Sequence, residues 1–298
     1  MSAELLDAQV FLEELHFGED PRLGPDGALY LSDFYDHRVL RVDMLTGERE
    51  VVCHVPRQPS GLGWLPDGRM LVVSMVDRSV LRLEPDGELV RHADLSGVAT
   101  FHANDMLVDA AGRAYVGNFG FDLHGFIDSH GEHALFAPGT EIPTADVALV
   151  EPDGSVRVVA PGMRFPNGTA LLPDGRMVIA ETLGLRLVVF DVAEDGSLAN
   201  PEVFADLSGA GAAPDGICAD AAGGVWVAAG VQACALRVTE GGRITHRVAT
   251  TQNTYAVALA GPNRDTLVCC TAPTSHPAVV AAGRHGRLET APAPHPAL

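Results

Sequence analysis

Four polar residues recur at one position of a repeated sequence unit and could together bind a divalent cation. Glu19, Asn104, Asn167 and Asp215 each stand eight residues before a turn glycine, and Ser60 has the same spacing. Two carboxylates and two carboxamides offer only oxygen donors, which suits calcium or magnesium best, with zinc and manganese as alternatives. Asp and Asn before glycine are also common in turns. Their recurrence at one repeat position favours a shared site, because burying unpaired carboxylates is costly.

The repeated unit has the pattern of a β-hairpin. Its clearest copy, residues 165–180 (FPNGTALLPDGRMVIA), has an apolar run, a tight glycine turn and a second alternating run. The turn glycines at 27, 68, 112, 175 and 223 are separated by 41, 44, 63 and 48 residues, and a less regular sixth copy runs from position 255 to the turn at 261–264. This period is typical of propeller blades. We therefore expect an all-β, six-bladed β-propeller with four-stranded antiparallel blades, whose innermost strands bring the four polar residues together at the central channel.

The repeats account for nearly all of the chain, which predicts a single domain over residues 1–298. The apolar alternation Ala8–Leu12 is expected to pair as an outer strand with the last blade and close the ring. The long spacing of 63 residues places an insertion at about 120–145, in the third blade. It should emerge on the face of the polar residues, either as a lid or as a plain surface excursion. The proline-rich residues 291–298 are expected to form a flexible tail.

Composition and charge exclude several classes of protein. Hydrophobic residues make up 47% of the chain and charged residues 20%, as in ordinary globular domains. The formal net charge of −19 would repel nucleic acid and anionic membranes, so neither is expected as a partner. The N-terminus lacks the pattern of a secretory signal, and no apolar run is long enough to span a membrane, which predicts a cytoplasmic protein. Five cysteines without C-x-x-C spacing are expected to be buried free thiols.

In its recurring polar residues and their neighbours, the chain resembles the family of senescence marker protein (regucalcin), gluconolactonase and luciferin-regenerating enzyme. The similarity covers essentially the full length, and the motifs that carry it, in the family's order, are Gly18-Glu19-Asp20-Pro21, Asn104-Asp105, Phe165-Pro166-Asn167-Gly168 and Pro214-Asp215-Gly216.

The resemblance implies a site and a reaction. It implies one divalent metal ion, most simply Ca²⁺ with Zn²⁺ or Mn²⁺ as alternatives, held by Glu19, Asn167 and Asp215, with Asn104 beside it or reaching it through water and substrate. It also implies hydrolysis of a cyclic ester, with Asp215 as the acid/base residue. Such chemistry is consistent with the residues, because a bound cation can polarise a lactone carbonyl while a carboxylate helps to deprotonate water.

Two positions depart from the sugar-lactonase pattern. His102 stands where the resemblance implies Arg, and Asp122 stands where it implies Glu. We expect His102, Asp122 and Asn104 to contact substrate, His102 by hydrogen bonding or proton transfer; a structural histidine in the channel wall is the alternative. Phe121, with Phe119 and Phe126, is expected either to line an apolar substrate pocket or to anchor the insertion.

The insertion carries three further histidines, at positions 124, 130 and 133. Their spacing matches no established zinc-ligand pattern, so we expect a solvated loop. No phosphate-binding glycine loop precedes a helix, which argues against nucleotide binding.

The sequence therefore predicts a metal-dependent lactonase, a carboxylic ester hydrolase of the gluconolactonase type acting on a small-molecule lactone or ester, as a monomer or weak homo-oligomer. One alternative keeps the metal site but hydrolyses an aryl ester or organophosphate, or serves a specialised pathway. A second alternative is a non-enzymatic calcium-binding or protein-interaction propeller.

Overall fold

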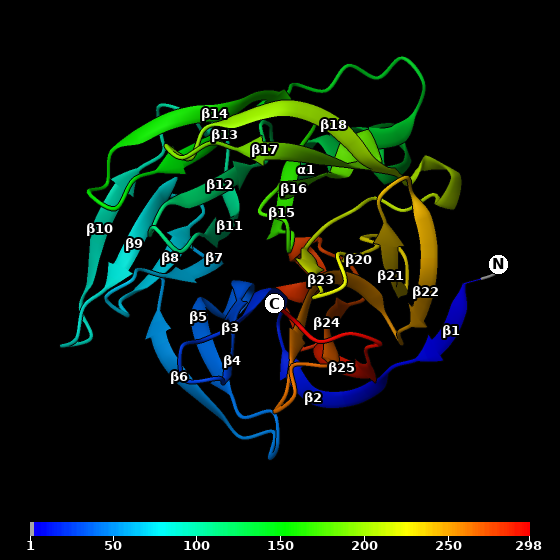
Figure 1. Ribbon diagram of the computed structural model, residues 1–298, viewed down its shortest axis with the longest axis horizontal. Helices are drawn as coiled ribbons and strands as arrows, with labels where there is room; N and C mark the ends of the chain where they lie inside the picture. Colours follow the sequence, from blue (N-terminus) through cyan, green and yellow to red (C-terminus); the bar gives the residue numbers. More distant parts are fainter. Residues whose placement is uncertain (1–2) are drawn as a thin grey trace.

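The computed structural model describes residues 3–298, and within that range the strands form six sheets arranged in a ring around a central space (Figure 1). Most sheets consist of four successive strands that pair as antiparallel neighbours. Within such a sheet, the first strand lines the channel and the following strands lie progressively farther out. The predicted six-bladed β-propeller is confirmed. No helix between residues 3 and 298 combines the length and apolarity needed to cross a membrane.

The first three blades follow the chain from the inside outward. Blade 1 contains β3 (Gly18–Leu23), β4 (Leu29–Asp33), β5 (Arg38–Val42) and β6 (Arg49–His54). Blade 2 contains β7 (Pro59–Trp64), β8 (Met70–Ser74), β9 (Ser79–Leu83) and β10 (Leu89–Asp94). Blade 3 contains β11 (Ala103–Val108), β12 (Ala114–Asn118), β13 (Ala145–Val150) and β14 (Val156–Met163).

The last three blades complete the ring. Blade 4 contains β15 (Pro166–Leu171), β16 (Met177–Glu181), β17 (Arg186–Val192) and β18 (Leu198–Asp206). Blade 5 contains β19 (Ile217–Ala219), β20 (Val225–Ala228), β21 (Cys234–Thr239) and β22 (Arg243–Ala249). Blade 6 contains β23 (Asn253–Ala260), β24 (Thr266–Ala272), β25 (Gly286–Pro292) and, as its outer strand, β2 (Gln9–Leu15).

The short helices all lie in connections between strands. They are the α-helices α1 (Leu123–His130) and α2 (Pro277–Val280) and the 3₁₀ helices η1 (Phe34–Asp36), η2 (Glu132–Phe136), η3 (Thr182–Gly184) and η4 (Ser208–Ala210). Both α1 and η2 fall in the predicted insertion between β12 and β13, so the extra residues of the third repeat fold into helices.

The ring is closed by strands from the two ends of the chain. The N-terminal β2 pairs antiparallel with β25, and this confirms the predicted closing strand. One strand was not expected: β1 (Glu4–Asp7) adds to the outside of blade 5, parallel to β22. The N-terminal residues thereby join two adjacent blades and cover two outer edges that could otherwise pair with another chain.

A break in strand register marks most innermost strands at the recurring polar position. The pairing shifts between Glu19 and Arg22 in β3, between Ala103 and Met106 in β11, and across Asn167 in β15. Such β-bulges re-aim side chains and are common next to functional sites. They let successive residues of one strand both face the channel.

Glycine follows the polar residue where neighbouring inner strands approach closely. A Cβ on Gly168 would lie 2.4 Å from the backbone nitrogen of Ile217, and one on Gly216 would lie 2.8 Å from the Cα of Ala256. Real Cβ atoms do not tolerate such contacts, so the Asn-Gly and Asp-Gly pairs here serve strand packing around the channel and not tight turns.

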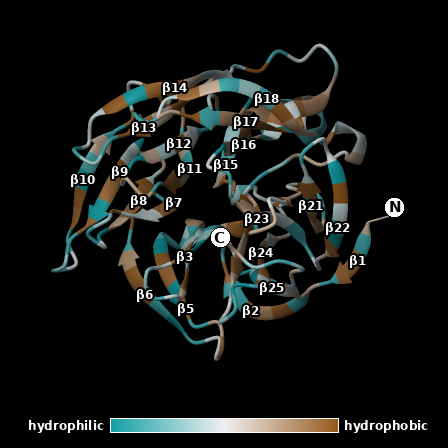
Figure 2. Ribbon diagram, in the orientation of Figure 1, coloured by the Kyte–Doolittle hydropathy of each residue, from teal (hydrophilic) through white to brown (hydrophobic). Residues whose placement is uncertain are grey.

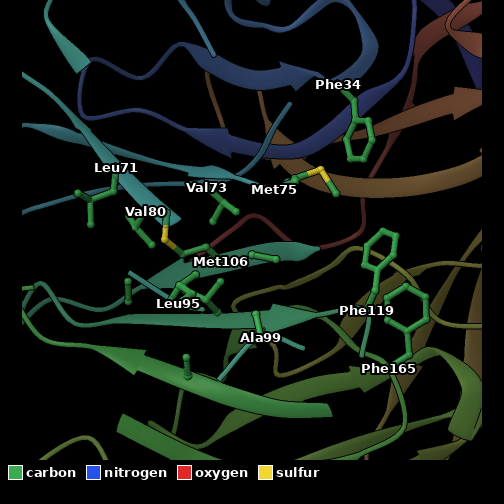
Figure 3. Close-up of a cluster of buried hydrophobic side chains, with 14 of the residues drawn as sticks. Phe34, Leu71, Val73, Met75, Val80, Leu95, Ala99, Met106, Phe119 and Phe165 are labelled. Carbon is green, nitrogen blue, oxygen red and sulfur yellow. The ribbon is translucent and has the colours of Figure 1, made fainter. Parts of the chain in front are cut away.

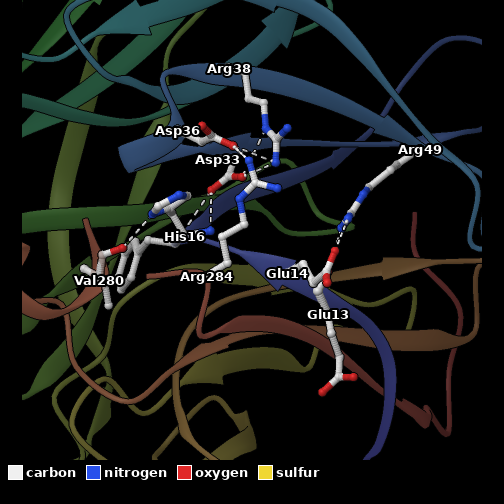
Figure 4. Close-up of polar contacts among 10 residues, drawn as sticks. Glu13, Glu14, His16, Asp33, Asp36, Arg38, Arg49, Val280 and Arg284 are labelled. Atoms are coloured by element: carbon white, nitrogen blue, oxygen red, sulfur yellow. Dashed lines mark hydrogen bonds and ion pairs between the residues drawn. The ribbon is translucent and has the colours of Figure 1, made fainter. Parts of the chain in front are cut away.

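A carboxylate at the end of the second strand fixes the chain that enters the inner strand. In blade 1 the Asp33 carboxylate accepts hydrogen bonds from the backbone N–H groups of His16 (2.9 Å) and Phe17 (3.1 Å) and pairs with Arg38 at 2.9 Å (Figure 4). In blade 4, Glu181 accepts from the Arg164 N–H at 2.8 Å. These bonds hold the backbone two or three residues before the polar position.

Apolar side chains pack between the blades, while outer strands such as β14 and β18 alternate hydrophobic and hydrophilic residues (Figure 2). All five cysteines are free; four are buried and Cys218 is half-buried.

The proline-rich end is hydrogen-bonded to the sixth-blade turn. The N–H of Ala293 donates to the Asp265 carbonyl at 2.7 Å, and that of Ala297 donates to the Arg264 carbonyl at 2.8 Å. Two alanines, Ala293 between prolines and Ala297 after the last one, supply these donors, which the prolines lack.

Candidate active site

A cavity of about 90 Å³ opens at one end of the central channel, enough for several water molecules. The four polar residues of the repeat position contribute to its lining: Glu19, Asn104 and Asn167 on inner strands, and Asp215 two residues before the inner strand β19. Most of the remaining wall is aromatic or aliphatic. The repeat position therefore places side chains from four blades in one cavity, as the constant spacing predicted.

Hydrogen bonds join the two carboxamides to each other and to the strands around them. The Asn104 Nδ2 donates to the Asn167 Oδ1 at 2.9 Å, and the Asn167 Nδ2 donates to the Thr182 hydroxyl at 3.1 Å. That hydroxyl donates to the Pro214 carbonyl at 2.7 Å, directly before Asp215. On the other side, the Ser60 hydroxyl donates to the Asn104 Oδ1 at 3.3 Å. The chain of bonds fixes the positions of the amides relative to Asp215.

Burial changes the acidity of both carboxylates in the cavity. Desolvation raises the pKa of Asp215 to about 7, although a hydrogen bond from Asn167 lowers it. Desolvation, together with the negative charges of Asp215, Asp105 and Asp20, raises the pKa of Glu19 well above its usual range. Glu19 is 6% exposed and belongs to no salt bridge within residues 3–298. The two carboxyl groups therefore lack a counter-charge from the described chain.

A second layer of charged residues lies next to this cavity within the channel. The Arg22 guanidinium pairs with Asp20 at 2.7 Å and donates to the Met106 carbonyl at 2.8 Å. Neither oxygen of the buried Asp105 accepts a hydrogen bond of ordinary geometry from residues 3–298. Burial, and then the charges of Asp20 and Asp215, raise the pKa of Asp105 well above its usual range. The positive charge of Arg22 thus lies near two buried carboxyl groups, Asp20 and Asp105, and lowers the pKa of both against the effect of burial.

The donor set fits a hard divalent cation. Two carboxylates without a counter-charge, the buried Glu19 and the half-buried Asp215, share one cavity with two carboxamides. Such a set of oxygen donors is the chemistry that calcium prefers. No three His, Cys, Asp or Glu side chains gather in a metal-binding arrangement anywhere in the described range. This agrees with the composition of the site, because two of its four polar residues are asparagines.

The sequence of the chain matches a known family over most of its length. Residues 17–273 match the model described as "SMP-30/Gluconolactonase/LRE-like region". The chain belongs to this family.

The chain is also similar to named relatives and, in its fold, to solved structures. A pentonolactonase from Haloferax volcanii is 28% identical over 260 residues, covering 86% of this chain and 81% of the relative. The solved structure of a calcium-binding regucalcin from Agrobacterium tumefaciens has a TM-score of 0.77 at 20% identity, covering 100% and 99% of the two chains. A gluconolactonase from Xanthomonas campestris has a TM-score of 0.72 at 21% identity, covering 96% of this chain and 89% of the solved one.

Three predicted substrate contacts, His102, Asp122 and Phe121, do not line the cavity. His102 stacks on Phe101 with ring centroids 4.2 Å apart, and desolvation lowers its pKa. Asp122 caps α1, where its carboxylate accepts the Gly125 N–H at 2.9 Å. Phe121 packs edge-on against Phe126, with ring centroids 6.0 Å apart. Their roles in binding substrate stay predictions.

Several lining residues could not be recognised from the repeat. One group consists of aromatic residues at or near strand ends: Phe17, Phe34, Tyr35, Phe165 and Tyr255. A second group comes from α1 and η2 of the insertion: Leu123, His124, Ile127, Glu132, Leu135 and Phe136. One signal for the second group was visible in the sequence, the excess length of the third repeat, and none was visible for the aromatic group.

Proposed function

We propose that the protein is a metal-dependent hydrolase that opens a lactone. The observation that carries the proposal is the meeting of two carboxyl groups and two carboxamides, from four blades, in one largely apolar cavity. Membership of a family with lactonase relatives supports the reaction type. Glu19, Asn167 and Asp215 would hold the ion, with Asn104 beside it. A bound divalent cation would polarise the ester carbonyl and stabilise negative charge on its oxygen.

Asp215 is the proposed acid/base residue. Desolvation raises the pKa of Asp215 to about 7 in the metal-free protein, and a bound cation would favour its ionised form. The carboxylate accepts a proton from water as the water oxygen attacks the carbonyl carbon. The bond between that carbon and the ring oxygen then breaks, and Asp215 returns the proton to the leaving oxygen. The products are one carboxylic acid and one alcohol group on an open chain, so a single proton shuttles and no other reactant is needed.

The neighbouring residues position this carboxyl group and exclude water. The bonds from Ser60 through Asn104 and Asn167 to Thr182 fix the amides beside Asp215. The apolar wall lowers the local dielectric constant, which strengthens the electrostatic interactions in the cavity. Hydrolysis of an aryl ester would use the same groups, and a non-enzymatic propeller would not need an acid/base residue.

Metal content and lactone hydrolysis should be measured on the native protein and on Glu19→Gln, with Glu202→Gln on the exposed outer strand β18 as the matched control. We expect about one divalent ion per chain in the native protein and in Glu202→Gln, with its loss in Glu19→Gln and with hydrolysis falling in parallel. Absence of bound metal in the native protein after incubation with Ca²⁺, Zn²⁺ and Mn²⁺, with lactones left intact, would refute the proposal and favour a binding propeller.

A further inference from the structure

The insertion covers the cavity with apolar side chains. From α1 and η2, the residues Leu123, Ile127, Leu135 and Phe136 all line it. The insertion is also attached to blade 6, because the His276 Nε2 lies 2.9 Å from the Asp128 Oδ1. His276 caps α2, so two connections from different blades meet above the cavity. This part of the wall is built mainly of hydrocarbon.

Aromatic rings from the blades form the rest of the wall. Phe119 and Phe165 lie with ring centroids 4.8 Å apart, and Phe34 points toward them from the first blade (Figure 3). On another side, Phe17 and Tyr255 have centroids 4.8 Å apart. These rings offer a large apolar surface to whatever enters above the polar residues.

Most polar atoms of the wall already have partners within the protein. The Tyr35 hydroxyl donates to the Ser275 carbonyl at 3.1 Å, and the Thr182 hydroxyl donates to Pro214. The predicted substrate contacts His102 and Asp122 do not line the cavity. The helices α1 and η2 of the insertion, which we call the cap, contribute two polar residues to the lining. Glu132 is exposed, and the His124 Nε2 is buried and has no hydrogen-bond partner within residues 3–298.

We infer that this site takes cyclic esters that carry an apolar substituent, in preference to polyhydroxylated sugar lactones. The inference rests on the proposed lactonase function and adds the substrate class to it. The ester group would meet the carboxyl and carboxamide groups, and the substituent would pack against the cap and the aromatic rings. Because the cavity is open on one side, a substituent longer than its volume of about 90 Å³ would extend outward along the same apolar wall. His124 could serve one substrate oxygen. Each sugar hydroxyl that lost water here without a partner would weaken binding by about 5- to 150-fold.

The test compares three substrates in the presence of Ca²⁺, Mn²⁺ or Zn²⁺: γ-decalactone, which carries a hexyl chain, γ-butyrolactone, which has the same ring without it, and glucono-1,5-lactone. We expect kcat/KM for γ-decalactone to exceed both others by about tenfold or more, the usual value of a buried alkyl group in an apolar pocket. Leu123→Asn in the cap should reduce the γ-decalactone to γ-butyrolactone ratio about threefold or more. Leu45→Asn, in an exposed turn, should leave the ratio unchanged.

The ratio of two substrates on one variant does not depend on the fraction of folded enzyme, so partial unfolding of Leu123→Asn cannot imitate the effect. Binding of 5-hexylpyrrolidin-2-one, a lactam that resists hydrolysis, is measured separately by calorimetry and should show a negative heat-capacity change. Lactam binding without hydrolysis of any lactone would refute the proposed reaction while supporting the apolar pocket. Preferred hydrolysis of glucono-1,5-lactone without lactam binding would overturn the substrate inference and leave the lactonase standing.

Discussion

Replacing Asp215 by Asn is expected to stabilise the metal-free protein at neutral and alkaline pH while removing its activity. The native pKa of Asp215 is about 7, above the ordinary value of 3.8. The folded protein therefore holds a proton that the unfolded chain has released between these two pH values. The contribution of protonated Asp215 to the free energy of unfolding is complete below pH 3.8 and is lost as the pH rises through 7.

The size of the effect follows from the same two values. At 1.36 kcal/mol per pH unit, the raised pKa of Asp215 lowers the free energy of unfolding by on the order of 4 kcal/mol at pH 8 and by about 1 to 2 kcal/mol at pH 5. Asn has nearly the same shape and carries no charge, so it removes this cost. The gain of Asp215→Asn over the native protein should grow from pH 5 to pH 8 by about 2 to 3 kcal/mol.

The measurement is urea denaturation followed by circular dichroism at pH 5, 6.5 and 8 in the presence of a chelator. Asp153→Asn is the control, because hydrogen bonds with Ser155 lower the pKa of this exposed turn residue; its loss of carboxylate should not stabilise the protein as pH rises. Added Ca²⁺ should reverse the order by stabilising only the native protein through mass action. A gain independent of pH, or a loss of stability in Asp215→Asn at pH 8, would show that burial does not control the acidity of this group.

Three further substitutions test the packing, the second charged layer and the cap. Gly168→Ala should destabilise the protein by about 1–3 kcal/mol because its Cβ would strike the neighbouring inner strand, whereas Gly97→Ala, which faces open space, should be nearly neutral; equal melting temperatures would contradict the close approach. Arg22→Met should cost about 3–5 kcal/mol in urea denaturation by leaving its buried carboxylate partner unpaired, and a neutral result would show that water reaches that layer. Asp128→Asn weakens the pair with His276, so proteolysis within the insertion should accelerate while global stability changes by less than about 1 kcal/mol; unchanged cleavage would mean that the pair does not hold the cap.

The constant spacing between polar residue and turn glycine was sufficient to predict the fold and the meeting of Glu19, Asn104, Asn167 and Asp215. A hairpin fixes the distance from its turn to its end, so equal spacing implies equal height along the channel. The closing strand could be predicted as well, because its alternation of apolar residues needs an open edge.

Other features of the site depend on contacts that a repeat pattern does not contain. Strict alternation along β11 would direct Asp105 away from the channel, but the register break beside Asn104 brings both residues into it. Insertion length predicted an excursion and could not specify that Leu123 and Ile127 would face the cavity. The parallel strand β1 was missed because four residues carry too little pattern to indicate a partner.

The closure of the ring by β2 and β25 determines when the protein can become functional during its synthesis. The strand that enters first must wait for one of the last to emerge, since residue 9 pairs with residue 290. Until then Glu19 is held in a blade without its neighbour on one side, and Asp215 belongs to another unfinished arc of the ring. Such long-range pairing is slow, and unpaired edges are prone to aggregation in the meantime. The central residues could therefore bind a cation only after β2 has paired with β25 and the ring has closed.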